Sequence, residues 1–187
     1  QLQSALPGKR IFVTDSGLHQ ALARQYLEIS HPGELLIPAD LQTMGFGLPV
    51  AIGAALAQPE SQVVAIVGDG AFCASGLELL TAIDQQLSLL VVVLDDGAYG
   101  LIRRQLRQES GSDFLVTRHT PNLRLFASSL DIEFFDLMSE NPSEIINSAI
   151  AARGVRMLRV PLSDTMRTSL KSLGAGIKDR VRRAFGT

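Results

Sequence analysis

The sequence lacks several features that would each indicate a particular class of protein. Among its 187 residues there is no tryptophan and only one cysteine, Cys73. A single cysteine excludes an internal disulfide and a zinc centre built from several cysteines. No apolar run approaches the roughly 20 residues that a membrane-spanning helix needs, and the start, QLQSALPGKR, has no apolar signal region. We therefore expect a protein of the cytoplasm that does not enter a membrane.

The sequence also lacks a large charge of either sign. Its 17 Lys and Arg residues nearly balance 19 Asp and Glu residues, for a net charge of −2. This balance gives no reason to expect a nucleic acid as partner. An apolar fraction of 46% and a charged fraction of 19% are typical of a folded globular chain. The absence of an initiator Met indicates a processed product or a piece of a longer protein.

Short apolar runs alternate with longer segments of helical period, which is typical of an α/β protein with a mostly parallel sheet. The runs at 62–67 and 89–94 are apolar throughout, as central strands covered by helices on both faces are. We expect strands at about 10–14, 35–38, 62–67, 89–94, 132–136 and 155–160. We expect helices near 17–29, 47–57, 74–86, 99–108, 121–129 and 142–153.

Residues 1–163 are expected to form one domain, and the tail at 164–187 differs from it in composition. From residue 165 on, the tail has six Lys or Arg residues, and Asp179 is its only acid. A basic amphipathic helix of this kind could meet a membrane surface or a nucleic acid. We favour the alternative, a solvated helical tail or a linker.

Two apolar runs each end in an acidic residue that is followed by glycine. The stretch VVAIVGDGAF contains Asp69, and LSLLVVVLDDGAYG contains Asp96, 27 positions further on. That distance matches one strand–helix–strand crossover, so we expect neighbouring strands with both carboxylates at one edge of the sheet. Adjacent carboxylates need a cation or a proton between them. Mg²⁺ fits this place because it takes oxygen ligands and keeps positions for water or phosphate.

The residues beside these acids favour a phosphate as the other occupant of the site. Gly68 and Gly70 would let the backbone approach a phosphate, and a helix that begins near Ala74 would point its free N–H groups at it. Each acid alone is more simply explained as a turn former, because Asp-Gly is a common turn pair. The two acids at matching strand ends instead predict a phosphate site bridged by magnesium.

The motif GDGAF followed by LDDGAYG resembles the thiamine diphosphate motif, in which Gly-Asp-Gly precedes a pair of residues that is usually Asn-Asn. The wider stretch PADLQTMGFGLPVAIGAALAQPESQVVAIVGDGAF is similar to the C-terminal domain of the acetolactate synthase family, which includes pyruvate oxidases and 2-oxo acid decarboxylases. The similarity runs from about Val13 to Gly100, and more loosely to Pro161. It implies a thiamine diphosphate-binding fold that holds thiamine diphosphate and Mg²⁺.

The resemblance implies a metal site of three protein ligands. These would be the carboxylates of Asp69 and Asp96 and the backbone carbonyl of Ala98, with diphosphate oxygens and water in the remaining positions. Asp96 replaces the family's second Asn, so the site has one more negative charge beside the diphosphate. We expect stronger metal binding and extra repulsion of the diphosphate, and the net effect on cofactor affinity stays open.

The segment DSGLHQ resembles the family's Gly-Gln-His segment, which makes His19 a contact of the diphosphate and places Gly17 in the cofactor site. Leu18 stands where the family has Gln, so one hydrogen bond to a phosphate is expected to be missing. Without the resemblance, His19 would be an ordinary, partly exposed histidine at a helix start. The backbone N–H groups of Gly70 and Ala71 would contact the diphosphate. The remaining cofactor-binding residues that the resemblance implies are Gly68, Ala98 and Tyr99.

Two residues before the second predicted helix would contact the rings of the cofactor. The resemblance makes Met44 the bulky residue that holds the cofactor bent, so that its amino group approaches the thiazolium carbon. The backbone carbonyl of Gln42, where the family often has Gly, would accept from that amino group. These two positions are the catalytic candidates of the chain. Taken by itself, Met44 would more simply be a core residue.

The resemblance also implies an activity and a missing part. The family needs a glutamate from a separate N-terminal domain, usually of a neighbouring subunit, and no segment here matches that domain. We therefore expect turnover only with that domain or a second subunit, within a homo-oligomer. The expected reaction is decarboxylation of a 2-oxo acid such as pyruvate and ligation of the two-carbon unit to an acceptor. The alternatives are a decarboxylase that does not ligate and a silent domain with a degenerate cofactor site.

Positions after the second acid bear on the reaction type. Ile102 stands where pyruvate decarboxylases of the family have Glu, which modestly favours carboligation. Gln105 stands where synthases that prefer 2-oxobutyrate have Trp, so the resemblance does not name the substrate. Cys73 is expected to be buried packing. Three arginines could steer a carboxylate substrate, although a solvated helix face is the favoured explanation: Arg103, Arg104 and Arg107.

Overall fold

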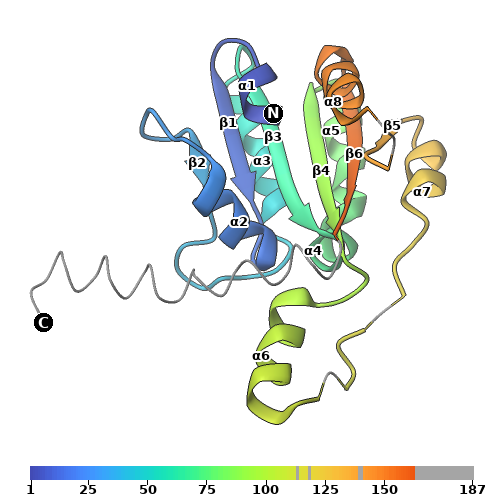
Figure 1. Cartoon of the computed structure of the whole chain (residues 1–187). Coiled ribbons are helices and arrows are strands. Elements are labelled where there is room, and N and C mark those ends of the chain that lie inside the picture. Colours follow the sequence, from blue (N-terminus) through green and yellow to red (C-terminus); the bar gives the residue numbers. More distant parts are fainter. Residues whose placement is uncertain (113, 118, 139–140, 163–187) are drawn as a thin grey trace, which may run out of the picture.

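A parallel sheet of six strands forms the centre of the protein (Figure 1). The computed structural model describes residues 1–162 except 113, 118, 139 and 140. Across the sheet the strands follow the order β2-β1-β3-β4-β6-β5, and each neighbouring pair is parallel. The α/β class predicted from the sequence is therefore confirmed. The strands are β1 (Arg10–Thr14), β2 (Leu35–Leu36), β3 (Gln62–Gly68), β4 (Leu89–Asp95), β5 (Glu133–Asp136) and β6 (Val155–Pro161).

Side chains alternate along each strand, so the sheet buries a different set of residues on each face. Val63, Ala65 and Val67 of β3 belong to a core cluster on one face, whereas Val64 and Ile66 belong to a cluster on the other. Because β3 and β4 are apolar on both faces, they occupy the centre of the sheet, as their continuous apolar runs predicted. The first face packs against α3 (Gly47–Ala57), α4 (Asp69–Ser75), α5 (Leu79–Asp84) and α7 (Leu123–Ser129), and the second against α2 (Leu18–Tyr26) and α8 (Pro142–Ala151).

Two helical segments differ from the sequence prediction. The helix expected from Ala74 begins at Asp69, directly after β3, and α4 and α5 are joined by the 3₁₀ turn η1 (Gly76–Glu78). Gly76 lies at the junction of α4 and this turn, and a Cβ there would lie 3.0 Å from the ring of Phe72. The short helix α1 (Leu2–Ala5) was not predicted, since four residues are too few for a periodic pattern.

Helix α6 (Gly100–Ser110) extends beyond the carboxyl ends of the strands, apart from the helices that cover the sheet (Figure 1). It ends at Gly111, whose φ of 68° gives the left-handed conformation typical of a helix C-terminus.

None of the described helices is long and apolar enough to cross a membrane. Cys73 is exposed, so the prediction that it packs in the core is wrong. The predicted basic tail at 164–187 lies outside the described residues.

The strand order creates a crevice between the carboxyl ends of β1 and β3. From β1 the chain runs through α2 to β2 on one side, and β3 then pairs with the other side of β1. Connections that diverge in this way leave a gap beyond the carboxyl ends, where ligands bind in open α/β sheets. The predicted neighbours β3 and β4 are paired, with Gly68 opposite Leu94. Asp69 and Asp96 therefore follow adjacent strand ends, as expected.

Candidate functional site

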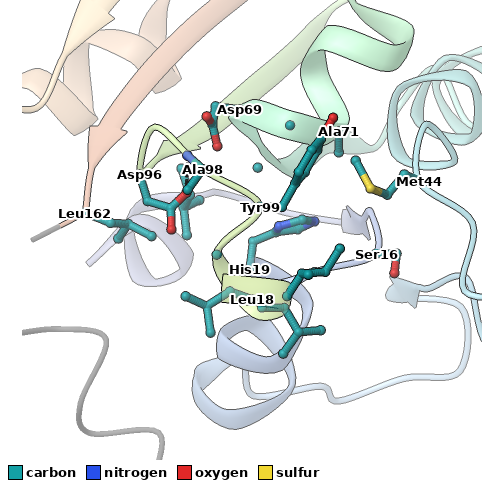
Figure 2. Close-up of a pocket in the computed structure, with 17 residues that line it drawn as sticks. Ser16, Leu18, His19, Met44, Asp69, Ala71, Asp96, Ala98, Tyr99 and Leu162 are labelled. Atoms are coloured by element: carbon teal, nitrogen blue, oxygen red, sulfur yellow. Dashed lines mark hydrogen bonds between the residues drawn. The ribbon is translucent and has the colours of Figure 1, made fainter. Parts of the chain in front are cut away.

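A pocket lies over this crevice, and its walls come from the segments that follow β1, β3 and β4. In the view of Figure 2, Asp69, Ala98 and Asp96 lie on one side of the pocket and Met44 lies on the other. All the predicted site residues line this pocket except Gln42. The pocket thus gathers residues that are far apart in the sequence: Gly17, His19, Met44, Gly68, Asp69, Gly70, Ala71, Asp96, Ala98 and Tyr99.

The segment after β1 brings a buried histidine into the pocket. Gly17 has φ 146°, a conformation that L side chains rarely adopt, and a Cβ at this position would lie 2.7 Å from Cε1 of His19. A Cβ at Gly68, on the next strand, would lie 2.9 Å from Nδ1 of the same ring. The imidazole therefore occupies the space that these two glycines leave open. It is only 5% exposed, unlike the partly exposed histidine that an unassigned helix start would have.

Burial controls the charge of this histidine. Removal from water lowers the pKa of His19 to about 4, against the opposing effect of a hydrogen bond to the backbone of Asp15. The ring is therefore neutral near pH 7. Its Nε2 is buried and has no hydrogen-bond partner among the described residues. A bound anion in the pocket would raise the pKa of His19 and give Nε2 a partner. Leu18 lines the pocket beside it and offers no polar side-chain atom.

The segment after β3 presents backbone and carboxylate groups together. Gly68 is the N-cap of α4, and Asp69 is the first residue of that helix. The side chain of Asp69 is 2% exposed and faces the pocket. Gly70 and Ala71 follow in the first turn, where backbone N–H groups have no partner within the helix. One strand end thus supplies a carboxylate for a cation and N–H groups for an anion.

The segment after β4 folds back on itself around Asp96. Oδ1 of Asp96 accepts a hydrogen bond from the Ala98 N–H at 3.2 Å, an Asx turn that orients the loop. The Tyr99 N–H donates to the Val116 carbonyl at 3.0 Å, which ties the loop to the segment after α6. Gly100 has no room for a Cβ because the Asp96 carboxylate occupies that space. The loop is therefore shaped around the carboxylate that the sequence predicts as a metal ligand.

A buried arginine compensates the extra charge of Asp96. Nη2 of Arg103 lies 3.3 Å from Oδ2 of Asp96, and both side chains are less than 10% exposed. Arg103 is the buried residue of α6, so the prediction of a solvated helix face is wrong at this position. The two carboxylates that line the pocket, those of Asp69 and Asp96, and the Arg103 guanidinium together sum to a charge of −1. An Asp and an Asn would give the same net charge.

The first residue of the Asp-Asp pair has a separate role. Oδ2 of Asp95 lies 2.7 Å from Nε of Arg159 on β6, and Arg159 also pairs with Asp136 at 3.2 Å. Asp95 does not line the pocket. It links the carboxyl ends of β4, β5 and β6, so the two acids of the motif differ in function although they are adjacent in sequence.

The loop before α3 brings Met44 to the opposite wall of the pocket. Met44 is 41% exposed, so it is not a core residue. Gln42 does not line the pocket, but its φ of 51° is unusual for a residue other than glycine. A left-handed conformation explains why glycine would be the favourable residue at this position.

Sequence reasoning missed Asp15, which follows β1 directly. Its carboxylate is fully buried and accepts hydrogen bonds from the N–H groups of Ser16, Gly45 and Gly47. A signal was present, because Asp15 follows an apolar strand just as Asp69 and Asp96 follow theirs.

The residues of the pocket fit a magnesium diphosphate. No group of three or more His, Cys, Asp or Glu side chains in the described part of the chain is arranged to hold a metal by itself. A cation would therefore need oxygen ligands from outside the carboxylate pair, which a diphosphate and the Ala98 carbonyl can supply. Two buried carboxylates at one wall suit the cation, and N–H groups at a helix start suit the anion.

Comparisons with known proteins agree with this arrangement. Residues 15–160 match the family model described as thiamine pyrophosphate enzyme, C-terminal TPP binding domain. The chain is 32% identical over 168 residues to the acetolactate synthase isozyme 2 large subunit of Escherichia coli K12, an alignment that covers 88% of the chain and 30% of that protein. It is 33% identical to the isozyme 1 large subunit of the same strain, over 80% of the chain and 27% of that protein.

A third relative comes from another bacterium. The acetolactate synthase large subunit of Lactococcus lactis is 34% identical over 140 residues, which is 74% of the chain and 24% of that protein. The chain thus spans less than a third of the length of each of these three relatives.

Proposed function

The chain belongs to the thiamine pyrophosphate enzymes as a C-terminal TPP-binding domain similar to that of acetolactate synthases, and we propose that it holds the diphosphate of thiamine diphosphate through Mg²⁺ in a carboligase. The observation that carries the proposal is the convergence of three strand ends on one pocket. His19, Asp69 and Asp96 come from different strand ends and line that pocket together.

Mg²⁺ would be held by the carboxylates of Asp69 and Asp96 and by the backbone carbonyl of Ala98. These groups share one wall of the pocket (Figure 2). Arg103 lowers the repulsion between this wall and a diphosphate, because it neutralises one of the two carboxylates. The net charge at the wall supports retention of the cofactor despite the Asp at position 96.

The diphosphate would lie against the first turn of α4 and against His19. Gly70 and Ala71 supply N–H groups, and the absence of side chains at Gly68 and Gly70 leaves room for the phosphate oxygens. His19 enters with a neutral ring and an unused Nε2. Because a nearby dianion favours the protonated ring, we expect His19 to take up a proton when the diphosphate binds.

The rings of the cofactor would lie towards Met44. When bound, thiamine diphosphate supplies a thiazolium carbon that adds to a 2-oxo acid and accepts the negative charge left by loss of CO₂. Met44 would hold the rings bent, and the carbonyl of Gln42 would orient the amino group. Ile102 also lines the pocket, and as an apolar residue it offers no acid for a proton transfer.

A carboligase acting on a 2-oxo acid such as pyruvate is the favoured activity, because the relatives named above are acetolactate synthases. The remaining parts of the active site would come from a pyrimidine-binding domain, on the same chain or on a second subunit of a homo-oligomer. Exposed apolar side chains near the pocket, such as Met44, Leu101 and Ile102, would be covered by that domain.

Calorimetric titration tests the binding site. Thiamine diphosphate is added to the chain with and without Mg²⁺, and then to Asp69→Ala and to the control Asp84→Ala, which removes an exposed acid of α5. We expect Mg²⁺-dependent heat for the unchanged chain and for the control, and its loss in Asp69→Ala. If the chain alone gives no heat, the same titrations are carried out on the natural, complete protein. Absence of binding there would refute the proposal in favour of a silent domain.

A further inference from the structure

Asp15 is buried beneath the loop that carries Met44. We propose that its carboxylate is a positioning group, which fastens the loop at 42–46 and the first residue of α3 to the end of β1 and so fixes Met44 and the Gln42 carbonyl for the rings of the cofactor. The inference rests on the proposed function, but it concerns a residue that lies outside the pocket. The side chain of Asp15 is fully buried.

The carboxylate accepts hydrogen bonds from the next residue and from a segment that begins 30 residues further along the chain. Oδ1 accepts from the Ser16 N–H at 2.7 Å and from the Gly45 N–H at 3.0 Å, and Oδ2 accepts from the Gly47 N–H at 2.6 Å. Hydrogen bonds to an ionised acceptor are about twice as strong as neutral ones. The loop is therefore held at two points on the C-terminal side of Met44.

The bond to Gly47 also stabilises α3. Gly47 is the first residue of α3, and the helix has no side-chain cap of its own. Its N–H groups at this end have no partners within the helix, and a negative charge here interacts favourably with the helix dipole. Asp15 thus caps α3 from a neighbouring strand and aligns the loop with the helix that follows it.

The fit between the loop and Asp15 leaves no spare space. A Cβ at Gly47 would lie 3.0 Å from Cβ of Asp15 and 3.1 Å from its Oδ2. The loop also contains two left-handed residues, Gln42 with φ 51° and Gly45 with φ 88°. Such conformations persist where the surrounding structure imposes them, and the bonds to Asp15 are contacts that do so.

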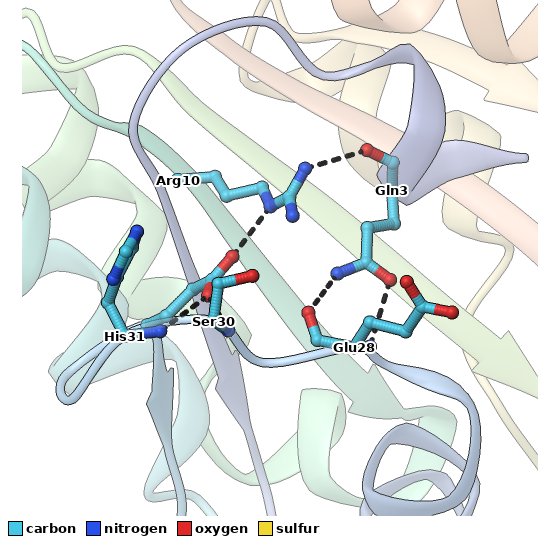
Figure 3. Close-up of polar contacts among 6 residues, drawn as sticks. Gln3, Arg10, Glu28, Ser30 and His31 are labelled. Carbon is cyan, nitrogen blue, oxygen red and sulfur yellow. Dashed lines mark hydrogen bonds and ion pairs between the residues drawn. The ribbon is translucent and has the colours of Figure 1, made fainter.

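A second buried carboxylate in the chain provides a matched control. Glu34 accepts hydrogen bonds from the N–H groups of Ser30 and His31 at 2.6 and 3.3 Å and pairs with Arg10 at 2.7 Å (Figure 3). It fastens a loop as Asp15 does, but it precedes β2 and so lies at the amino edge of the sheet, away from the pocket. Loss of Glu34 should loosen a loop without an effect on the cofactor.

The variant Asp15→Asn is selective because an amide has a single acceptor oxygen. With that oxygen in the place of Oδ1, the bonds from Ser16 and Gly45 remain, and the amide nitrogen faces the Gly47 N–H donor. The segment that leads to His19 keeps its bond, so the diphosphate side of the pocket is spared. The bond between Asp15 and α3 is lost.

The experiment compares two ligands on the natural, complete protein and its Asp15→Asn and Glu34→Gln variants. Thiamine diphosphate reports on the whole cofactor site, and inorganic pyrophosphate with Mg²⁺ reports on the diphosphate side alone. We expect Asp15→Asn to weaken thiamine diphosphate binding about tenfold and pyrophosphate binding by less than about twofold. We expect Glu34→Gln to change neither affinity. Hydrogen exchange at the Gly47 amide should accelerate in Asp15→Asn only.

Two further variants test the same contact from the loop side. Gly47→Ala places a methyl group 3.0 Å from Cβ of Asp15 and 3.0 Å from Cγ1 of Val67, whereas Gly53→Ala, in the same helix, meets no atom within 4 Å. Gly47→Ala should show the same difference between the two ligands as Asp15→Asn, and Gly53→Ala should bind both ligands normally. If Asp15→Asn does not fold, this pair of variants decides the question.

The outcomes separate this inference from the function on which it rests. Equal loss of both ligands in Asp15→Asn and Gly47→Ala would overturn the positioning role, since it would indicate general damage. Unchanged binding of both ligands would overturn it too. Failure of the unchanged protein to bind thiamine diphosphate would instead refute the proposed function.

Discussion

Acidification should destabilise the protein through His19, because burial keeps this ring neutral in the folded state. The pKa of His19 is about 4 in the folded state, whereas the ordinary value of a histidine, which applies to the unfolded chain, is 6.5. Between these two values the unfolded chain binds a proton that the folded chain does not, so stability is present above pH 6.5 and is lost as the pH falls towards 4. From pH 7 to pH 5 this amounts to about 2 kcal/mol, since one pKa unit corresponds to roughly 1.4 kcal/mol.

The assay is urea unfolding at pH 7 and pH 5 for the unchanged chain, His19→Gln and His31→Gln. Asp15 makes the opposite contribution to the pH dependence of stability. Burial raises the pKa of Asp15 despite its hydrogen bonds from Gly47, Ser16 and Gly45. The ionised Asp15 therefore opposes folding as the pH rises, and the comparison with His19→Gln removes this contribution. His19→Gln should lose about 2 kcal/mol less than the unchanged chain on acidification, and His31→Gln, at an exposed site, should behave like the unchanged chain. Equal losses in all three would refute the burial of a neutral His19.

Two further substitutions test the packing and charge of the pocket. Gly17→Ala should reduce the free energy of unfolding by at least about 1 kcal/mol more than Gly33→Ala, because both have positive φ but only a Cβ at 17 meets the ring of His19. Urea unfolding of the two variants measures this difference, and equal losses would contradict the close contact. Arg103→Gln should reduce the free energy of unfolding by roughly 2–3 kcal/mol, because it removes the guanidinium that pairs with the buried Asp96 carboxylate. Asp96→Asn added to that variant should restore most of the loss, and a double mutant less stable than Arg103→Gln would contradict the compensation of charge.

The sequence predicted the elements that depend on local periodicity. The runs at 62–67 and 89–94 became central strands because both faces of each run are apolar, and the helix at 47–57 has the predicted bounds. The adjacency of Asp69 and Asp96 was also predictable, since one crossover connects β3 to β4. The place of β1 beside β3 was not predicted, because no periodic pattern determines which strands pair across the sheet.

The environment of single side chains could not be predicted because it depends on contacts between distant segments. His19 is buried where Gly17, before α2, and Gly68, at the end of β3, leave space for its ring, and Arg103 is buried by a pair with Asp96 from the preceding loop. Helical periodicity alone predicts that an arginine lies on the solvent-exposed face of a helix. Cys73 shows the reverse error, because it was expected to be buried and the structure exposes it.

The most direct test of the central claim is a crystal structure of the natural, complete protein with thiamine diphosphate and Mn²⁺ in place of Mg²⁺. The account predicts an anomalous peak for the metal between the carboxylates of Asp69 and Asp96 and the Ala98 carbonyl. It also predicts the diphosphate within hydrogen-bond distance of Nε2 of His19. A metal held by other residues, or a cofactor bound away from the ends of β1, β3 and β4, would contradict the account.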